Sequence, residues 1–314
     1  MYNESPSRNV AEPAPGAAET HLHDLAAAEE VQPVLRPAAS LAGNSDFLPF
    51  FGLQELPFSD AVNPKYYYKT DGHDEAFIRL LLAIRHDISL GLVTGPSGSG
   101  KTLLSQLILQ GLDPLKHEAA LVLVSPDMSK TALLRAILDE LEVTAPDGPF
   151  VSAQELLRLL QNRVIDLHHQ GKKLVILVDE CHFLPADTLH MVRTISNLEV
   201  PERKLVSILL FGEDRFLKRL EHPSYESLRN RMYLRSELRP MDLNDTTQYI
   251  KFRLLIAGRM DDLFAETAFA VVHELSGGVC RRVNKLCTLA LIEGFLRRQA
   301  TLDAAVVRAC ADRL

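Results

Sequence analysis

The feature that most constrains the fold of this chain is the segment Gly95–Thr102, which reads Gly-Pro-Ser-Gly-Ser-Gly-Lys-Thr and follows a short apolar run. The spacing GxxxxGKT is typical of a phosphate-binding loop between a strand and a helix. Its glycines permit backbone conformations in which successive N–H groups converge on a phosphate. Lys101 adds a positive charge where β- and γ-phosphates would lie, and Thr102 offers its hydroxyl to Mg²⁺. The predicted nucleotide-binding residues are Gly95, Pro96, Ser97, Gly98, Ser99, Gly100, Lys101, Thr102 and Leu103.

The second half of the predicted site lies further along the chain, where an apolar run at 173–178 leads directly into Asp179 and Glu180. The carboxyl ends of parallel strands meet at one edge of a sheet, so we expect this acid pair beside the phosphate loop. There Asp179 can hold Mg²⁺ through water, and Glu180 can orient or deprotonate an attacking water. We therefore predict Lys101, Asp179 and Glu180 as catalytic residues, and Thr102 and Asp179 as the residues at the metal.

Apolar runs that alternate with amphipathic helices predict a parallel sheet covered on both faces. The expected strands are 90–94, 119–125, 173–178, 205–211 and 232–238, and further helices are expected at 73–86, 129–141, 152–168, 186–198 and 214–220. After residue 244 only helices are expected, at 246–257, 265–275, 280–297 and 303–312. The predicted fold class is α/β: a P-loop domain with a five-stranded parallel sheet, followed by a C-terminal helical lid.

Composition divides the chain into three parts. Residues 1–45 are rich in Ala, Pro and Glu, and we expect a disordered leader because such a segment buries too little apolar surface to offset its ordering entropy. The α/β nucleotide-binding domain is expected over 46–240 and the helical lid domain over 241–314. At the start of the folded part, the aromatic-rich stretches 50–58 and 64–68 suggest an extended segment on the domain edge. Core packing of their rings is favoured over stacking on a purine base.

Charge and cysteine content restrict the partners and the compartment. The formal charge of −7 over 314 residues indicates no general attraction for nucleic acid. The cysteines are too widely spaced for a CxxC metal site, and we expect reduced, mostly buried thiols at Cys181, Cys280, Cys287 and Cys310. Neither a secretory signal peptide nor an apolar run of the roughly 18 residues that span a bilayer is recognisable. We expect a cytoplasmic protein, whose attachment to the inner face of the membrane would need a partner.

With these residues in place, the chain resembles the AAA+ ATPases of the ExeA/GspA type, a family associated with type II secretion and with pilus biogenesis, including the MSHA pilus. The blocks that carry the resemblance are FGLQELPF (51–58), GPSGSGKT (95–102), LVDECHFL (177–184), ISNLE (195–199), LRNRM (228–232), YIKFRLLIAG (249–258) and SGGVCRRVNKLC (276–287). The resemblance covers about residues 47–314, and seven blocks in the family's order make it specific.

The resemblance implies an enzyme that hydrolyses ATP to ADP and phosphate with Mg²⁺. It also implies a homo-oligomer, either a hexamer or a filament, with nucleotide at the subunit interfaces. Arg229 or Arg231 would reach the γ-phosphate of a neighbouring subunit, and Arg281 in the lid would sense the nucleotide of its own subunit. A guanidinium in such a position adds fixed positive charge as negative charge shifts during phosphoryl transfer. The implied partner is a protein assembly of the envelope, of the secretion or pilus type.

Two features depart from the family's pattern. Glu213 stands where the family has glutamine, and an anion cannot donate a hydrogen bond to phosphate, so the sensor role of this position stays open. A nucleotide-gated scaffold with little hydrolysis is a third reading of such a site. The chain also ends with the lid, whereas secretion members often continue into a membrane helix and a cell-wall-binding domain; we expect another protein to supply these.

The alternative function is a DNA-transposition target-selection ATPase of the TniB or TnsC kind, which would bind duplex DNA through a basic surface lining an oligomer. The candidate basic residues are spread around the lid, at Arg281, Arg282, Lys285, Arg297 and Arg298. The run Asp179–His182 also has the DExH form of a helicase. A helicase motor needs a second sheet domain, and the residues after Pro240 are too few to form one.

Overall fold

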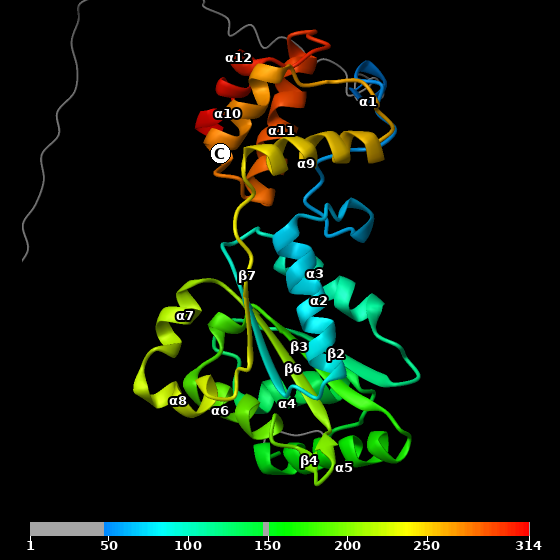
Figure 1. Cartoon of the computed structure of the whole chain (residues 1–314), viewed down its shortest axis with the longest axis vertical. Coiled ribbons are helices and arrows are strands. Elements are labelled where there is room, and N and C mark those ends of the chain that lie inside the picture. The colour runs from blue at the N-terminus through cyan, green and yellow to red at the C-terminus, as the bar shows by residue number, and fades with distance from the viewer. Residues whose placement is uncertain (1–46, 147–150, 314) are drawn as a thin grey trace, which may run out of the picture. The chain divides into compact units, whose positions relative to one another are not determined.

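The computed structural model describes residues 47–146 and 151–313, and the predicted leader lies outside them. Its central sheet has five parallel strands in the order β2-β3-β6-β1-β7 (Figure 1). Their bounds are β1 (Leu90–Thr94), β2 (His117–Leu123), β3 (Lys173–Asp179), β6 (Val206–Gly212) and β7 (Leu234–Glu237). The predicted five-stranded parallel sheet is confirmed. A two-stranded antiparallel pair, β4 (Glu199–Val200) with β5 (Arg203–Lys204), was not predicted, because two residues are too few to show an alternating pattern.

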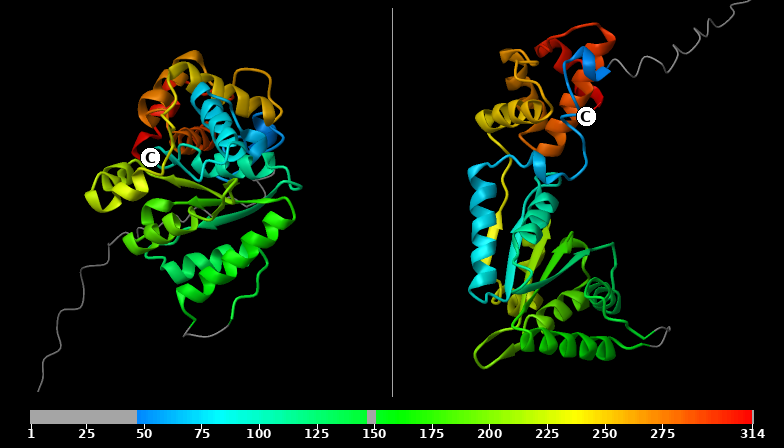
Figure 2. Two further views of the ribbon diagram at one scale, coloured as in Figure 1. Left: turned by 60° about the horizontal axis from the view of Figure 1, so that its bottom comes forward. Right: turned by 90° about the vertical axis from the view of Figure 1, so that its right-hand side faces the viewer.

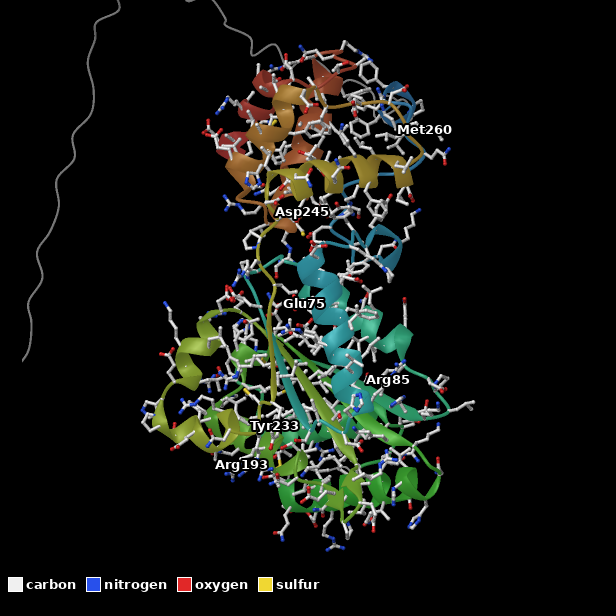
Figure 3. The ribbon with its side chains drawn as sticks, viewed as in Figure 1. Glu75, Arg85, Arg193, Tyr233, Asp245 and Met260 are labelled. Carbon is white, nitrogen blue, oxygen red and sulfur yellow. The ribbon has the colours of Figure 1, made fainter. Side chains whose placement is uncertain are left out.

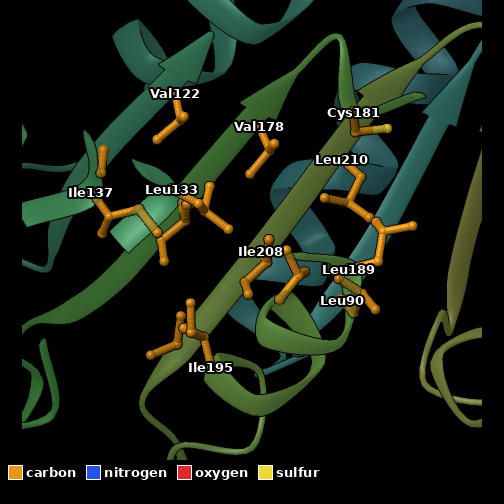
Figure 4. Packing of buried hydrophobic residues seen from close by; sticks show 14 of the residues in the cluster. Leu90, Val122, Leu133, Ile137, Val178, Cys181, Leu189, Ile195, Ile208 and Leu210 are labelled. Carbon is orange, nitrogen blue, oxygen red and sulfur yellow. The ribbon is translucent and has the colours of Figure 1, made fainter. Parts of the chain in front are cut away.

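Helices cover both faces of the sheet, as Figures 1 and 2 show. On one face lie α2 (Asp71–Arg85) and α3 (Lys101–Gly111), and on the other lie α4 (Lys130–Glu140), α5 (Ala153–His169) and α6 (Ala186–Ile195). The side chains of successive β3 residues point to opposite faces of the sheet. Ile176 packs with α4–α6, and Leu177 packs with α2 and α3. Figure 4 shows part of the larger of the two cores, in which Leu133 and Ile137 of α4 lie near the strands.

The chain after β6 forms short helical pieces: α7 (Arg215–Leu220), the 3-10 turn η4 (Pro223–Tyr225) and α8 (Glu226–Arg229). A further 3-10 turn, η3 (Cys181–Phe183), follows β3. A polar side chain caps the first turn of α2, α4, α5 and, later in the chain, the helix that begins at Leu243. Ser152 accepts a hydrogen bond from the N–H of Glu155, whose carboxylate in turn accepts from the N–H of Ser152, so that α5 begins with a complete capping box.

The last part of the described chain is helical, as predicted. It consists of α9 (Leu243–Ile256), α10 (Glu266–Ser276), α11 (Cys280–Leu296), α12 (Ala304–Arg308) and the 3-10 turn η5 (Ala311–Arg313). These helices share one apolar core, separate from the two cores of the sheet. Within the described ranges, no helix combines the length and the apolar character needed to cross a bilayer. The four cysteines are free thiols, and all except the half-buried Cys280 are buried.

The prediction of an extended segment on the domain edge at 50–58 is wrong. The chain instead forms α1 (Phe47–Phe50) and turns, and η2 (Pro64–Tyr66) follows. The predicted core packing is confirmed, because Phe51 and Phe58 are buried in the core of α9–α12. Contacts with distant residues contribute to this conformation, such as the hydrogen bond from the guanidinium of Arg253, on α9, to the carbonyl oxygen of Pro57. The N-terminal segment thus shares a core with the lid helices, while the domain boundary after residue 240 stays a prediction.

Candidate nucleotide site

The phosphate loop connects β1 to α3, and two of its glycines have backbone conformations that side chains rarely adopt. Gly98 has φ of +79° and Gly100 has φ of +98°. A Cβ on Gly98 would lie 2.5 Å from Cβ of Arg281, and a Cβ on Gly95 would lie 2.6 Å from the carbonyl oxygen of Leu238. The loop therefore fits its surroundings only with glycine at these positions.

Lys101 begins α3 and is 6% exposed. Its Nζ donates to the carbonyl oxygens of Gly95, at 3.0 Å, and of Pro96, at 2.9 Å. Burial lowers the pKa of this amine, while the negative charges of Glu180 and Glu213 act in the opposite direction. The loop's own carbonyls thus hold the ammonium group in place, so that the charge is fixed before any phosphate arrives.

The two predicted metal residues come from different elements and meet. Thr102, in the first turn of α3, donates from Oγ1 to Oδ2 of Asp179 at 2.7 Å. Asp179 is the last residue of β3 and is 1% exposed, and its Oδ1 accepts from the N–H of Glu180 at 2.9 Å. A hydroxyl and a carboxylate side by side are the oxygen donors that Mg²⁺ prefers, so the residues present fit this ion.

Glu180 follows β3 in a left-handed conformation with φ of +56°. Such backbone strain in a residue with a side chain is frequent at functional sites. Burial, and then the charge of Asp179, raise the pKa of the Glu180 carboxyl. A carboxylate with a raised pKa is a better proton acceptor near neutral pH. Its Oε2 lies 3.3 Å from Nδ1 of His182.

His182 lies between two carboxylates, although the sequence alone did not identify it as a site residue. Its side chain is 1% exposed, and Nε2 lies 3.9 Å from Oε2 of Glu213. Glu213 in turn is paired with Nε of Arg215 at 3.0 Å. Possible ligand atoms of Glu180, His182 and Glu213 lie within 4.8 Å of one another. The ion-pair contacts, however, join the two carboxylates to different ring nitrogens, which suits a chain of contacts better than a single ion.

A cleft beside the loop could accept the base of a nucleotide. Its lining includes Val62, Tyr66, Tyr67, Thr102, Met241, Arg281 and Asn284. The hydroxyl of Tyr67 is buried and has no hydrogen-bond partner among residues 47–146 and 151–313, and burial raises its pKa to about 12. The aromatic rings that the sequence suggested for the core therefore also border the candidate site.

His73, on α2, supports the loop from behind and was not predicted. Its Nε2 lies 2.8 Å from the carbonyl oxygen of Ser99, and Nδ1 lies 2.6 Å from Oγ1 of Thr70. Because the Ser99 carbonyl can only accept, Nε2 carries the proton in this arrangement. Burial lowers the pKa of His73, which favours the neutral ring.

Arg281 reaches the phosphate loop from α11. Its N–H donates to the carbonyl oxygen of Gly98 at 3.1 Å, and its guanidinium lies 3.4 Å from Oγ of Ser97 and 3.5 Å from Oδ1 of Asp60. The side chain is 58% exposed and lines the cleft. The structure therefore brings together Lys101, Thr102, Asp179, Glu180 and Arg281.

Arg229 and Arg231 lie away from this group. Arg231 shares a surface depression with Ser89 and Lys204, which precede β1 and β6, so it lies at the amino edge of the sheet. Tyr233, labelled in Figure 3, lines the same depression. The phosphate loop follows the carboxyl end of β1. A strand rises about 3.3 Å per residue, so a five-residue strand separates the two edges by roughly 15 Å. Neither arginine can serve the site of its own subunit from this position.

Comparisons with known proteins bear on the family and the fold of the chain. The family model described as an AAA domain matches residues 84–220. General secretion pathway protein A of Aeromonas hydrophila is 36% identical over 248 residues, which are 79% of this chain and 45% of that protein. The chain thus spans less than half the length of this curated relative.

Solved structures share the fold at low sequence identity. The ORC2 protein of Aeropyrum pernix, in its ADPNP and ADP complexes, superposes with a TM-score of 0.61 at 17% identity, over 82% of this chain and 71% of that one. Cdc6p of Pyrobaculum aerophilum gives 0.63 at 16% identity, over 78% and 67%. These likenesses concern the fold, a P-loop sheet domain with a helical C-terminal region.

Proposed function

The chain belongs to the AAA+ proteins and is related to general secretion pathway protein A, and from this premise we propose that it binds Mg·ATP and hydrolyses it to ADP and phosphate. The observation that carries the proposal is the 2.7 Å contact between Thr102 and Asp179 next to the buried ammonium of Lys101. Two oxygen donors and one fixed cation converge where the loop N–H groups would meet a triphosphate.

Each residue has a role that its surroundings support. Lys101 binds the β- and γ-phosphates, and Thr102 and Asp179 hold the metal. Mg²⁺, when bound, supplies positive charge that neutralises phosphate oxygens. Glu180 orients the attacking water and accepts its proton, a task favoured by the raised pKa of its carboxyl. Arg281 links the lid to the loop through Gly98 and senses bound nucleotide.

We assign the shared arginine to Arg231 in preference to Arg229. The guanidinium of Arg229 already donates to the carbonyl oxygens of Leu220, at 2.9 Å, and Glu221, at 3.1 Å. The guanidinium of Arg231 makes no hydrogen bond or ion pair with the residues that the structure describes, and burial, followed by the charge of Arg231, lowers the pKa of the nearby Lys204. An uncompensated arginine far from its own site is suited to the γ-phosphate of a second copy.

Steady-state ATPase activity tests the proposal. Lys101→Ala is expected to lose at least a hundredfold in turnover, because it removes the fixed cation at the phosphates. Lys116→Ala is the matched control, since Lys116 is an exposed lysine whose ion pair with Asp113 at 3.6 Å lies at the other edge of the sheet. Equal turnover of Lys101→Ala and the wild type would disprove an enzymatic function at this loop.

The relative's name supports a partner in a secretion-type envelope assembly, which the chain would regulate or remodel from the cytoplasmic side. The alternative, duplex DNA in transposition, stays a prediction. Adding duplex DNA at two salt concentrations separates the two, because phosphate contacts by Lys and Arg make DNA binding strongly salt-dependent. A large stimulation of ATPase activity that falls with salt would favour DNA; unchanged turnover would favour the protein partner.

A further inference from the structure

A continuous set of contacts connects the catalytic end of β3 with the segment that carries Arg231. It starts at Glu180, whose carboxylate lies 3.3 Å from His182. The carbonyl oxygen of His182 then accepts from the guanidinium of Arg219, on α7, at 3.3 Å. The proposed function explains Glu180 and Arg231, but it gives no role to the residues between them.

Arg219 uses its whole guanidinium for this connection. Besides the His182 carbonyl, it donates from Nε and from the second terminal nitrogen to the hydroxyl of Tyr225, at 3.2 and 3.0 Å. Its guanidinium carbon also lies 5.3 Å from the ring centre of Tyr225. The guanidinium is planar and rigid, and its three hydrogen bonds fix the His182 carbonyl and the Tyr225 hydroxyl relative to each other better than the flexible side chain of a lysine would.

Tyr225 transmits this constraint to the arginine segment. It is buried, it ends η4 and it is the N-cap residue of α8, which carries Arg229 and leads into Arg231. At the other end of α8, the guanidinium of Arg229 donates to the carbonyl oxygens of Leu220 and Glu221, at the C-terminal end of α7. The helix that precedes Arg231 is therefore attached to α7 at both ends, and α7 is attached through Arg219 to the turn after Glu180.

We propose that Arg219 is a positioning residue that, together with Tyr225, holds Arg231 at the subunit surface in the geometry that serves the neighbouring subunit, and that couples this geometry to the turn after Glu180. The inference rests on the proposed function, in which Arg231 completes the site of a second copy. Arg219 itself touches neither nucleotide nor metal.

Three variants separate positioning from general damage. Arg219→Gln removes the guanidinium group, and Tyr225→Phe removes only the hydroxyl that accepts hydrogen bonds from it. Lys218→Gln is the control, because Lys218 is the neighbouring, exposed cation of α7. We expect turnover to fall about tenfold or more for Arg219→Gln and less for Tyr225→Phe, since a displacement of about 1 Å can cost a hundredfold in rate. ATP affinity, measured by titration with a fluorescent ATP analogue, is expected to stay within twofold of the wild type.

Mixed oligomers then show on which site Arg219 acts. The reference mixture, Arg231→Ala with Glu180→Gln, should regain activity because the first subunit has an intact Glu180 and the second an intact Arg231. Arg219→Gln mixed with Glu180→Gln should regain activity in the same way. Arg219→Gln mixed with Arg231→Ala should stay inactive, because neither subunit can offer a well-placed arginine.

Each outcome is decisive. If Arg219→Gln restores activity to Arg231→Ala, its Arg231 is functional and the inference is wrong. Loss of ATP binding in Arg219→Gln, with wild-type turnover in Lys218→Gln, would assign Arg219 to its own subunit's site and also overturn it. If the reference mixture itself stays inactive while Lys101→Ala abolishes wild-type turnover, the chain is an ATPase without a shared arginine, and the shared site and this inference both fail.

Discussion

Gly98 and Gly171 share nearly the same left-handed φ, +79° and +76°, in opposite surroundings. A Cβ on Gly171 would meet nothing within 4 Å, whereas one on Gly98 would lie 2.5 Å from Cβ of Arg281. Alanine costs roughly 1–2 kcal/mol of backbone strain at either position. We predict that only Gly98→Ala also weakens ATP binding, by at least about tenfold or 1.4 kcal/mol, because it displaces Arg281 from the loop. Titration with ATP measures this, and equal affinities of the two variants would contradict it.

His73 predicts a pH dependence of stability. Its pKa in the folded protein is lowered by burial, so the unfolded chain binds a proton more readily. The pKa of this histidine in the unfolded chain is about 6.5. The free energy of unfolding therefore keeps its full value above that pH and falls as the pH drops below it. We expect the melting temperature of His73→Gln to fall less than that of the wild type between pH 7.5 and pH 5.5, because glutamine does not titrate in this range. The amide can still donate to the carbonyl oxygen of Ser99, so the hydrogen bond is kept. The exposed His86→Gln serves as the control and should follow the wild type.

Among the elements, the N-terminal segment is held by a buried guanidinium in addition to its buried rings. Arg253 of α9, 5% exposed, donates to the carbonyl oxygen of Pro57 at 2.6 Å and to Oδ1 of Asn284 at 3.1 Å. It also lies 4.5 Å from the ring centre of Tyr66. One side chain thus joins the segment before the sheet to α9 and α11.

Arg253→Met is therefore expected to destabilise the protein by about 3 kcal/mol, because it leaves several buried acceptors without a partner. The control is Lys251→Met on the same helix. Lys251 pairs with Asp262 at 3.4 Å, and their side chains are 36% and 63% exposed, so loss of this solvent-screened pair should cost less than about 1 kcal/mol. Urea denaturation monitored by circular dichroism gives both values. A difference between the two variants smaller than about 1 kcal/mol would show that the guanidinium does not anchor the segment.

Some elements of this fold could be predicted from the sequence, and others could not. β1 was predicted residue for residue, because five buried residues end at a loop whose glycine and lysine spacing is itself diagnostic. The conformation of the segment 50–58 was not predicted, because it depends on contacts with distant residues, among them Arg253, which follows Pro57 by 196 positions. Contacts between such distant residues leave no periodic signal in either stretch.

The residues of the candidate site also fall into two groups, those that the sequence identified and those that it did not. Lys101, Thr102, Asp179 and Glu180 were identified because their spacing is fixed by one loop and one strand end. His73 and His182 were not, since each becomes relevant only through a neighbour from another element, Ser99 in one case and Glu213 in the other. A lone histidine in an amphipathic helix or after an acid pair has no pattern that distinguishes it from an ordinary core residue.

At the scale of the whole molecule, the two functional ends of the sheet face away from each other. The carboxyl edge holds Lys101, Asp179 and Glu180, and the amino edge holds Arg231 beside Ser89 and Lys204. In the function proposed above, each end carries one half of a site, and head-to-tail contact between copies would bring the two halves together. Hydrolysis should therefore depend on assembly.

The most direct test of this account is the turnover of the wild-type protein per subunit, measured at saturating Mg·ATP over a wide range of protein concentration, with the oligomeric state followed by light scattering. We predict that turnover per subunit is low where the chain is monomeric, and rises to a plateau as oligomers form. Arg231→Ala should remain low at every concentration while still assembling. Full turnover per subunit at concentrations where only monomer is present would contradict a shared site.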